Sequence, residues 1–373
     1  MRNLLLPVAL ALCPYFYFVC KRFLGTLGVK LTRLFARLAL LSVVCALALC
    51  GMLLSWTSAV FLLHLAAFAG IVQLCNFILK LCARKRYEEG FSVWKRLYGL
   101  LVLPLLFSAA ATVYGYVNLH SVRQTSYTVY TPKQIDADGY RVALIADVHF
   151  GISLDEQELL EKCAEIEAQA PDLVILCGDI VDNSSTREGM QAVFAILGSI
   201  KSTYGVYYVF GNHDRLYRMG DLPFSVDDLM AAIGAAGITV LQDTVMQITP
   251  DLVLVGREDR SGARGDTPRA AIAELLEGVD PADFILTLDH QPNEYAENAA
   301  AGTDLLLSGH THGGQLFPLN ILQEIVPFND GVYGQYALGE DQLAIVTSGF
   351  GTWEIPVKTV GPAEYVIIDI LPK

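Results

Sequence analysis

The first 120 residues have almost no acidic side chains, only Glu88 and Glu89, against twelve Lys and Arg. The rest of the chain has the opposite balance, 14 basic against 37 acidic residues, so a segment of net charge +10 precedes one of -23. These are two different kinds of polypeptide. An acidic domain repels the phosphates of nucleic acid, and we therefore expect no nucleic-acid partner.

Cysteine is scarce in the acidic segment. Six of the eight cysteines lie in or near apolar stretches of the first segment, which leaves Cys163 on a helical pattern and Cys177 inside an apolar strand. Two buried thiols are a better interpretation of this pair than a disulfide, and the sequence shows no disulfide framework of the secreted type. Internal repeats and low-complexity segments are absent as well.

Acidic and basic residues are also missing from four long apolar stretches of the first segment. These are Leu4–Cys20, Leu38–Leu54, Ser58–Leu79 and Leu97–Leu119. Each is about as long as the ~17–25 residues that span a bilayer, which predicts a module of about four transmembrane helices over residues 1–120. A buried soluble helix bundle is disfavoured because such helices normally carry a charged face. The first stretch could instead be a signal-peptide core, although no small-residue cleavage site follows it. The uncharged spans argue against an ion pathway.

Basic residues are concentrated in two of the connecting loops, Lys21–Arg37 and Ala83–Arg96. The positive-inside rule places both loops in the cytoplasm, where they would meet anionic lipid. We therefore expect a multi-pass protein of the cell membrane, with everything after His120 on the extracytoplasmic side.

After the membrane module, residues 121–139 form a linker and a first strand, at the alternating Ser126–Tyr130, and residues 140–373 form a globular domain. Further strands are expected at Tyr140–Ala146, Leu173–Cys177, Gly205–Phe210, Thr239–Leu241, Val245–Ile248, Leu252–Gly256, Phe284–Leu288, Thr303–Leu307, Leu343–Thr347 and Tyr365–Ile370. Helices are expected at Asp155–Ala170, Arg187–Ile200, Ser225–Ala236, Thr267–Leu276 and Glu294–Ala301. Successive strand, loop and helix units predict an α/β fold with its chemistry at the carboxyl ends of parallel strands.

Carboxylate, amide and imidazole side chains follow five of these strands. They are Asp147 and His149, Asp179 and Asp182, Asn212 with His213 and Asp214, His290, and His310 with His312. Oxygen and nitrogen ligands without thiolates suit Mn²⁺, Fe or Zn²⁺. They are too many for one ion, which suggests two divalent ions that clamp a phosphoester and supply a bridging hydroxide. Taken singly, the Asp and Asn residues could be turn residues, and His290 could be a satisfied polar residue of the core.

The motifs Asp-x-His, Gly-Asp-x-x-Asp, Gly-Asn-His-Asp, a lone His and Gly-His-x-His occur here in one order. In that order the sequence resembles the calcineurin-like metallophosphoesterases over about residues 140–370. The strings Gly256–Arg260 and Ser308–Phe317 resemble the bacterial membrane-associated branch of that family. The resemblance implies a four-layer αββα sandwich.

The same resemblance implies roles for individual residues. Asp147, His149 and His312 would hold one metal ion, Asn212, His290 and His310 the other, and Asp179 would bridge them. His213 would face the substrate, to protonate the leaving oxygen or stabilise charge, and Asp182 would orient it through a hydrogen bond, with Asp214 as a competitor.

The function expected is hydrolysis of a phosphomonoester or phosphodiester at the membrane surface, where a lipid or envelope phosphoester is a suitable substrate. The alternative is a non-catalytic sensor or scaffold with a vestigial phosphoesterase fold. Arg257 and Arg260 could contact the substrate phosphate, or lie in a solvated loop with Arg264 and Arg269. For Trp353, packing in the core is favoured over a place at the mouth of the site.

Overall fold

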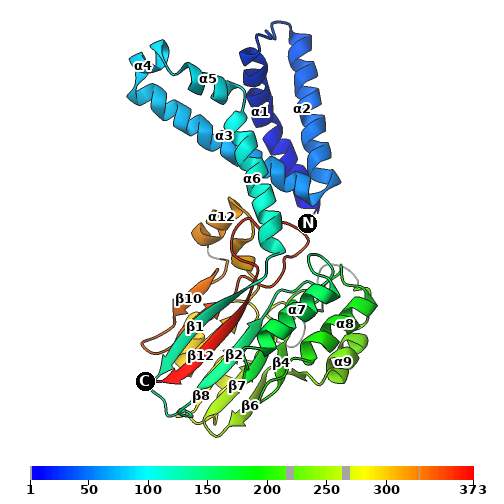
Figure 1. Ribbon diagram of the computed structural model, residues 1–373, viewed down its shortest axis with the longest axis vertical. Helices are drawn as coiled ribbons and strands as arrows, with labels where there is room; N and C mark the ends of the chain where they lie inside the picture. Colours follow the sequence, from blue (N-terminus) through cyan, green and yellow to red (C-terminus); the bar gives the residue numbers. More distant parts are fainter. Residues whose placement is uncertain (1, 216–221, 263–268, 327) are drawn as a thin grey trace. The chain divides into compact units, whose positions relative to one another are not determined.

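The computed structural model describes residues 2–215, 222–262, 269–326 and 328–373, and it divides into two compact units, Met1–Tyr116 and Val117–Lys373 (Figure 1). The N-terminal unit is helical throughout. Its helices are α1 (Arg2–Thr26), α2 (Leu34–Leu54), α3 (Trp56–Cys82), α4 (Arg84–Glu89), α5 (Ser92–Gly99) and α6 (Val102–Leu119). Four of them, α1, α2, α3 and α6, are long and apolar enough to cross a membrane.

Helices α1, α2 and α3 pack through small or flexible side chains, among them Ala9, Met52 and Ala59, which are all at least 99 % buried. Small residues allow helices to approach closely, as is common between membrane helices. Large apolar side chains point outward elsewhere, for example Leu47 and Leu54 of α2. A bundle that folds in water would bury such residues, so this surface suits a lipid environment.

The fourth apolar stretch differs from its prediction. The structure divides Leu97–Leu119 between α5 and α6, because Leu101 has a left-handed backbone with φ of 57° that no α-helix can continue through. Pro104 then falls in the first turn of α6, where its missing N–H is tolerated. The basic loop between the third and fourth stretches is itself helical, as α4 and α5.

Two six-stranded mixed sheets form the centre of the C-terminal unit, ordered β1-β12-β2-β3-β4-β5 and β10-β11-β9-β8-β7-β6. The strands of the first sheet are β1 (Arg123–Thr131), β2 (Tyr140–Ile145), β3 (Leu173–Cys177), β4 (Val206–Val209), β5 (Thr239–Val240) and β12 (Glu364–Pro372). Those of the second are β6 (Thr244–Thr249), β7 (Leu252–Gly256), β8 (Phe284–Leu288), β9 (Leu305–Ser308), β10 (Gly334–Ala337) and β11 (Leu343–Val346).

The sheets face each other and helices cover their outer faces, which confirms the four-layer αββα sandwich (Figure 1). Leu144, Ile175 and Leu286 belong to the core between the sheets. Helices α7 (Glu156–Glu167), α8 (Arg187–Gly198) and α9 (Val226–Ala235) cover the first sheet, whereas α10 (Ile272–Leu275) and α11 (Tyr295–Ala301) lie on the second. Strands that are buried on both sides require a continuous apolar sequence, which is why the central strands could be predicted from the sequence.

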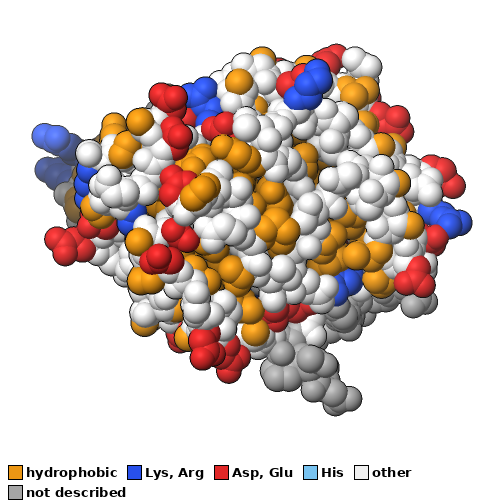
Figure 2. Space-filling view, turned by 90° about the horizontal axis from the view of Figure 1, so that it is seen from below, with side chains coloured by type: hydrophobic (Ala, Val, Ile, Leu, Met, Phe, Trp, Pro, Cys, Tyr) orange, Lys and Arg blue, Asp and Glu red, His pale blue; other side chains and the backbone are white. Residues whose placement is uncertain are grey.

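Among the described residues of the C-terminal unit, strand β10, helix α12 (Leu319–Ile325) and a 3-10 turn at His312–Gly314 lie outside every predicted range. The helix expected at Thr267–Leu276 is shorter, since α10 covers only Ile272–Leu275 and Thr267 lies outside the described residues. On the face shown in Figure 2, red acidic side chains lie along the margin around an apolar middle and blue basic ones are fewer, in keeping with the acidic sequence.

Candidate metal centre

The candidate ligands lie in loops that follow five neighbouring strands. In the first sheet, the parallel strands β2, β3 and β4 end shortly before Asp147, Asp179 and Asn212. In the second, the parallel strands β8 and β9 end shortly before His290 and His310. Because parallel strands end at the same edge of a sheet, and the two sheets face each other, these loops meet at one end of the sandwich.

Several candidate ligands have a left-handed backbone, which is uncommon for residues with a side chain. The φ angle is 53° at Asp147, 44° at His149, 53° at Asp179, 73° at His310 and 52° at His312. A strained conformation costs on the order of 1–3 kcal/mol and persists only where the surrounding structure enforces it, often at functional sites. The strain therefore marks this end of the sandwich as functional.

Glycines allow the loops to approach the two carboxylates closely. A Cβ atom at Gly309 would lie 2.5 Å from Oδ2 of Asp147, and one at Gly211 would overlap Oδ1 of Asp179. Any larger residue at either position would displace a carboxylate. This explains why Gly precedes both Asn212 and His310 in the motifs.

The side chains gather in two groups, Asp147 with His149 and His312, and Asp179 with His290 and His310. Within each group, one ligand atom from each residue lies within 4.8 Å of the others. The carboxylates are held by backbone N–H groups: His310 N donates to both oxygens of Asp147 at 3.0 Å, and His213 N donates to Oδ1 of Asp179 at 2.8 Å. Six of the seven expected ligands are thus brought together, with Asp179 in the group of His290 and His310.

Three of the imidazoles are fixed through their Nδ1 atoms. Nδ1 of His149 lies 2.9 Å from Oδ2 of Asp182, that of His290 lies 2.7 Å from the Cys177 carbonyl, and that of His312 lies 3.4 Å from the Gly351 carbonyl. An acceptor at Nδ1 orients the ring and turns Nε2 toward the site, which is the usual arrangement behind a metal-bound histidine.

Two buried atoms of the candidate ligands have no hydrogen-bond partner among the described residues, namely Nε2 of His149 and Oδ1 of Asn212, and Nε2 of His290 faces the carboxylate of Asp179 at 3.1 Å. A buried polar atom without a partner is costly unless something else satisfies it. Each of these oxygen and nitrogen atoms is of a kind that binds divalent metal ions. The residues therefore fit divalent cations.

The charges of the site also suit cations. Burial and the neighbouring His290 lower the pKa of His310 to about 4, and burial, reinforced by His149, lowers the pKa of His312 well below its usual value. Both imidazoles are therefore neutral at pH 7, as ligands must be. Burial alone would raise the pKa of Asp179, but His290 and His213 hold it well below its usual value, so this carboxylate is ionised.

The hydrogen bond expected between Asp182 and His213 was wrong. Asp182 bonds Nδ1 of His149 because the loops after β2 and β3 run side by side, with His149 N donating to the Asp179 carbonyl at 3.1 Å. Asp214 is not the partner either: its carboxylate accepts backbone N–H groups at Asp179, Ile180, Val181 and Gly211. Asp182 is thus placed to position a candidate ligand, His149.

His213 lies at the edge of the two groups. It is 94 % buried, its ring centroid is 5.2 Å from that of His149, and its Nδ1 has no hydrogen-bond partner among the described residues. Trp353 is half-buried, with its ring centroid 4.5 Å from that of His213. Trp353 therefore borders the site, contrary to the favoured expectation of core packing.

Nothing in the sequence indicates that Lys358 and Ser348 lie beside the candidate site. Lys358 is fully buried and its Nζ donates to the Ser348 carbonyl, while Ser348 Oγ donates to the His312 carbonyl at 3.2 Å. Burial lowers the pKa of Lys358 to about 7. A lone lysine in a loop reads as a surface residue, so only the fold reveals that it supports the His312 loop.

The phosphate contact considered for Arg257 is not available in this structure. Arg257 is 98 % buried and its Nη1 lies 2.9 Å from a carboxylate oxygen of Glu294. Arg269 makes a second ion pair with Glu294 and one with Asp289, the residue before His290. These arginines stabilise the loop that carries His290. Arg260 is exposed, and Arg264 lies outside the described residues.

The C-terminal unit is thus an αββα sandwich. At the ends of its central strands, two groups of Asp and His side chains offer oxygen and nitrogen ligands to metal ions. The profile of the calcineurin-like phosphoesterase family matches residues 140–314, and the chain belongs to this family.

Its relatives include three proteins of different origin. An uncharacterized metallophosphoesterase of Aquifex aeolicus is 30 % identical, covering 70 % of this chain and 96 % of that protein. One from Campylobacter jejuni is 27 % identical, covering 73 % and 72 %. A transmembrane protein with metallophosphoesterase domain from Danio rerio is 28 % identical, covering 78 % of this chain and 66 % of its own length.

Proposed function

We propose that this protein is a membrane-anchored phosphoesterase that uses two divalent cations to hydrolyse a phosphomonoester or phosphodiester. The observation that carries the proposal is the convergence of six candidate ligands in two groups, with Nδ1 of three histidines already held by acceptors. Asp147, His149 and His312 would hold one cation, and Asn212, His290 and His310 the other, with Asp179 between them. Mn²⁺, Fe and Zn²⁺ all suit this donor set.

The cations, when bound, would polarise a phosphoryl oxygen and supply a nucleophile from water. The chain's own residues do the rest. Asp182, the Cys177 carbonyl and the Gly351 carbonyl hold the imidazoles in the tautomer that ligation needs. His213, which borders both groups, would donate its proton to the leaving oxygen or stabilise negative charge on the phosphoryl group.

Removal of metal is the test of this proposal. We expect the purified full-length protein to hydrolyse bis-p-nitrophenyl phosphate, to lose that activity after chelation, and to regain it with Mn²⁺, Fe²⁺ or Zn²⁺. Metal analysis should find close to two ions per chain. Metal-bound protein with no hydrolysis of mono- or diesters would favour the vestigial, non-catalytic alternative.

The membrane anchoring is supported by the four apolar helices and by the zebrafish relative, whose name describes a transmembrane protein. We infer that the loops at residues 21–37 and 83–96 face the cytoplasm and that the C-terminal unit is extracytoplasmic.

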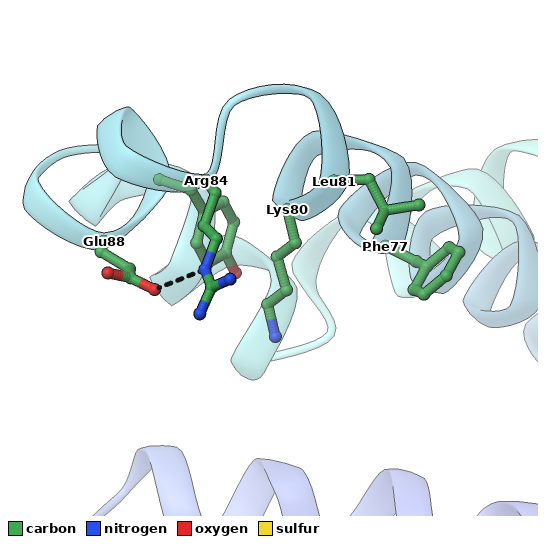
Figure 3. Close-up of a pocket in the computed structure, with 6 residues that line it drawn as sticks. Phe77, Lys80, Leu81, Arg84 and Glu88 are labelled. Atoms are coloured by element: carbon green, nitrogen blue, oxygen red, sulfur yellow. Dashed lines mark ion pairs between the residues drawn. The ribbon is translucent and has the colours of Figure 1, made fainter.

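At the end of α3, Lys80 and Arg84 line a hollow of about 520 Å³ together with Phe77 and Leu81 (Figure 3). Basic groups beside apolar ones suit an anionic lipid head group, although Glu88 pairs with Arg84 at 3.5 Å.

A cysteine-accessibility experiment tests this orientation. A membrane-impermeant maleimide applied to intact cells should label a cysteine introduced at the exposed Glu161 of α7. It should label one introduced at the exposed Lys85 of α4 only after the membrane is permeabilised. Labelling in the reverse order would place the catalytic unit in the cytosol.

A further inference from the structure

Helix α12 has its polar and apolar sides reversed. Its apolar residues are exposed, namely Leu319, Ile321, Leu322 and Ile325, together with Val326 after its end. Ile325 is 71 % exposed and Leu322 is 52 % exposed, whereas Asn320 and Gln323 are partly buried, with amide oxygens that have no hydrogen-bond partner among the described residues. Glu324 is the only charged residue of the helix. A helix that packs on a protein in water normally has the opposite arrangement.

The helix is built directly onto the metal centre. Only four residues separate Gly314 from Leu319, and a Cβ atom at Gly314 would lie 2.6 Å from Cβ of Asn320, so the first turn of α12 packs on the loop of His310 and His312. Asn320 N donates to the Leu316 carbonyl at 3.0 Å and anchors that turn. The exposed apolar side chains therefore belong to a helix whose first turn is anchored on the loop of two candidate ligands.

The same region is connected to the point where the chain enters the C-terminal unit. Thr359 N and Val360 N donate to the Gln315 carbonyl at 2.8 and 3.1 Å. In turn, Nδ2 of Asn118 donates to the carbonyls of Lys358 and Gly361 at 3.0 and 2.7 Å. Asn118 is the second-last residue of α6, the last apolar helix. Within the C-terminal unit, α12 thus lies at the end where β1 begins (Figure 1).

We propose that the exposed face of α12 inserts into the surface of the membrane that carries the apolar helices, and so presents the metal centre to phosphoesters borne on lipid. The proposal rests on the proposed function. A short helix with apolar residues outward and one charge is suited to the interface between head groups and acyl chains.

Quenching by brominated lipid tests the insertion. We expect the full-length Ile325→Trp variant, reconstituted in vesicles of phosphatidylcholine brominated on its acyl chains, to lose more fluorescence than the wild type, whose tryptophans are 56, 94 and 353. The matched control is Leu160→Trp, since Leu160 is 45 % exposed on α7. No added quenching at position 325, or equal added quenching at both positions, would overturn the proposal.

A second pair of variants tests the consequence for substrate. Leu322→Gln with Ile325→Gln should lower kcat/KM for phosphatidic acid in phosphatidylcholine vesicles by about tenfold or more, because two apolar contacts with the membrane are lost. Hydrolysis of glycerol phosphate and of bis-p-nitrophenyl phosphate should be unchanged. The control pair, Leu160→Gln with Met230→Gln, should leave all three rates unchanged.

The outcomes separate this inference from the function on which it rests. If the Gln pair at residues 322 and 325 instead lowered the oligomeric mass in nanodiscs, the face would be an interface between copies of the chain and the proposal would be wrong. If the wild type hydrolysed none of the phosphoesters, the proposed function would fail, and quenching at position 325 would still decide whether α12 enters the membrane.

Discussion

Asp179→Asn is expected to remove most of the phosphoesterase activity and at least one metal ion. The carboxylate lies between the two groups, with Oδ2 3.1 Å from His290 Nε2 and 3.8 Å from His149 Nε2. Asparagine has nearly the same shape and can still accept the hydrogen bond from His213 N, so the variant removes chiefly the charge. Metal catalysis of this kind contributes several kcal/mol, so we expect kcat/KM to fall by roughly three orders of magnitude or more.

The matched control is Asp172→Asn at the other end of the same strand. Asp172 accepts hydrogen bonds from Arg141 N at 2.8 Å and from Thr203 Oγ1 at 3.0 Å, so its loss perturbs a similar network without touching the centre. We expect normal metal content and nearly normal rates in this control, with a small loss of thermal stability. An Asp179→Asn protein that retained two ions per chain would refute the bridging role.

Most of the sandwich could be predicted because its central strands are buried on both faces. The bounds of β3, β7 and β8 agree with the predicted runs, which are continuous and apolar. The gathering of the ligands followed from the same observation, since strands that run parallel end at one edge. Strand β10 was missed because it is short and only half-buried, so its sequence has no clear alternation.

Helix α12 was missed for a different reason. Sequence analysis finds a helix from an apolar stripe that faces the core, but α12 turns Asn320 and Gln323 inward and its apolar residues outward. Its four large apolar residues within seven positions form no long run and carry no capping signal. An apolar helix face that points to the surface cannot be distinguished, from the sequence alone, from a buried segment.

The partner of Asp182 could not be predicted from spacing. Two acids, Asp182 and Asp214, were available for His213, and their distance along the chain gave no basis for the geometry. The choice is made by the backbone bonds between the loops after β2 and β3, which bring His149 next to Asp182. Those loops have left-handed residues at positions 147, 149 and 179, a conformation that local sequence preference does not specify.

His213→Ala is expected to reduce kcat by about 10²–10⁴-fold while the protein keeps its full complement of metal, because a general acid contributes about that factor. The side chain lies beside His149 and Trp353, but it belongs to neither ligand group. KM for bis-p-nitrophenyl phosphate should change much less than kcat. Metal analysis of the purified variant checks that the centre is intact, and loss of an ion would instead make His213 a ligand.

Asp182→Asn should behave differently, because Asp182 bonds His149 and not His213. Loss of the carboxylate charge behind a metal ligand typically weakens metal affinity by about 10–100-fold, so the defect of Asp182→Asn should disappear at saturating metal. The double variant that combines Asp182→Asn with His213→Ala separates the two roles. If Asp182 acted through His213, this double variant would be no slower than His213→Ala at any metal concentration. We expect instead that at limiting metal the double variant is slower than His213→Ala, because Asp182 acts on metal affinity through its bond to His149 whereas His213 acts on the chemical step.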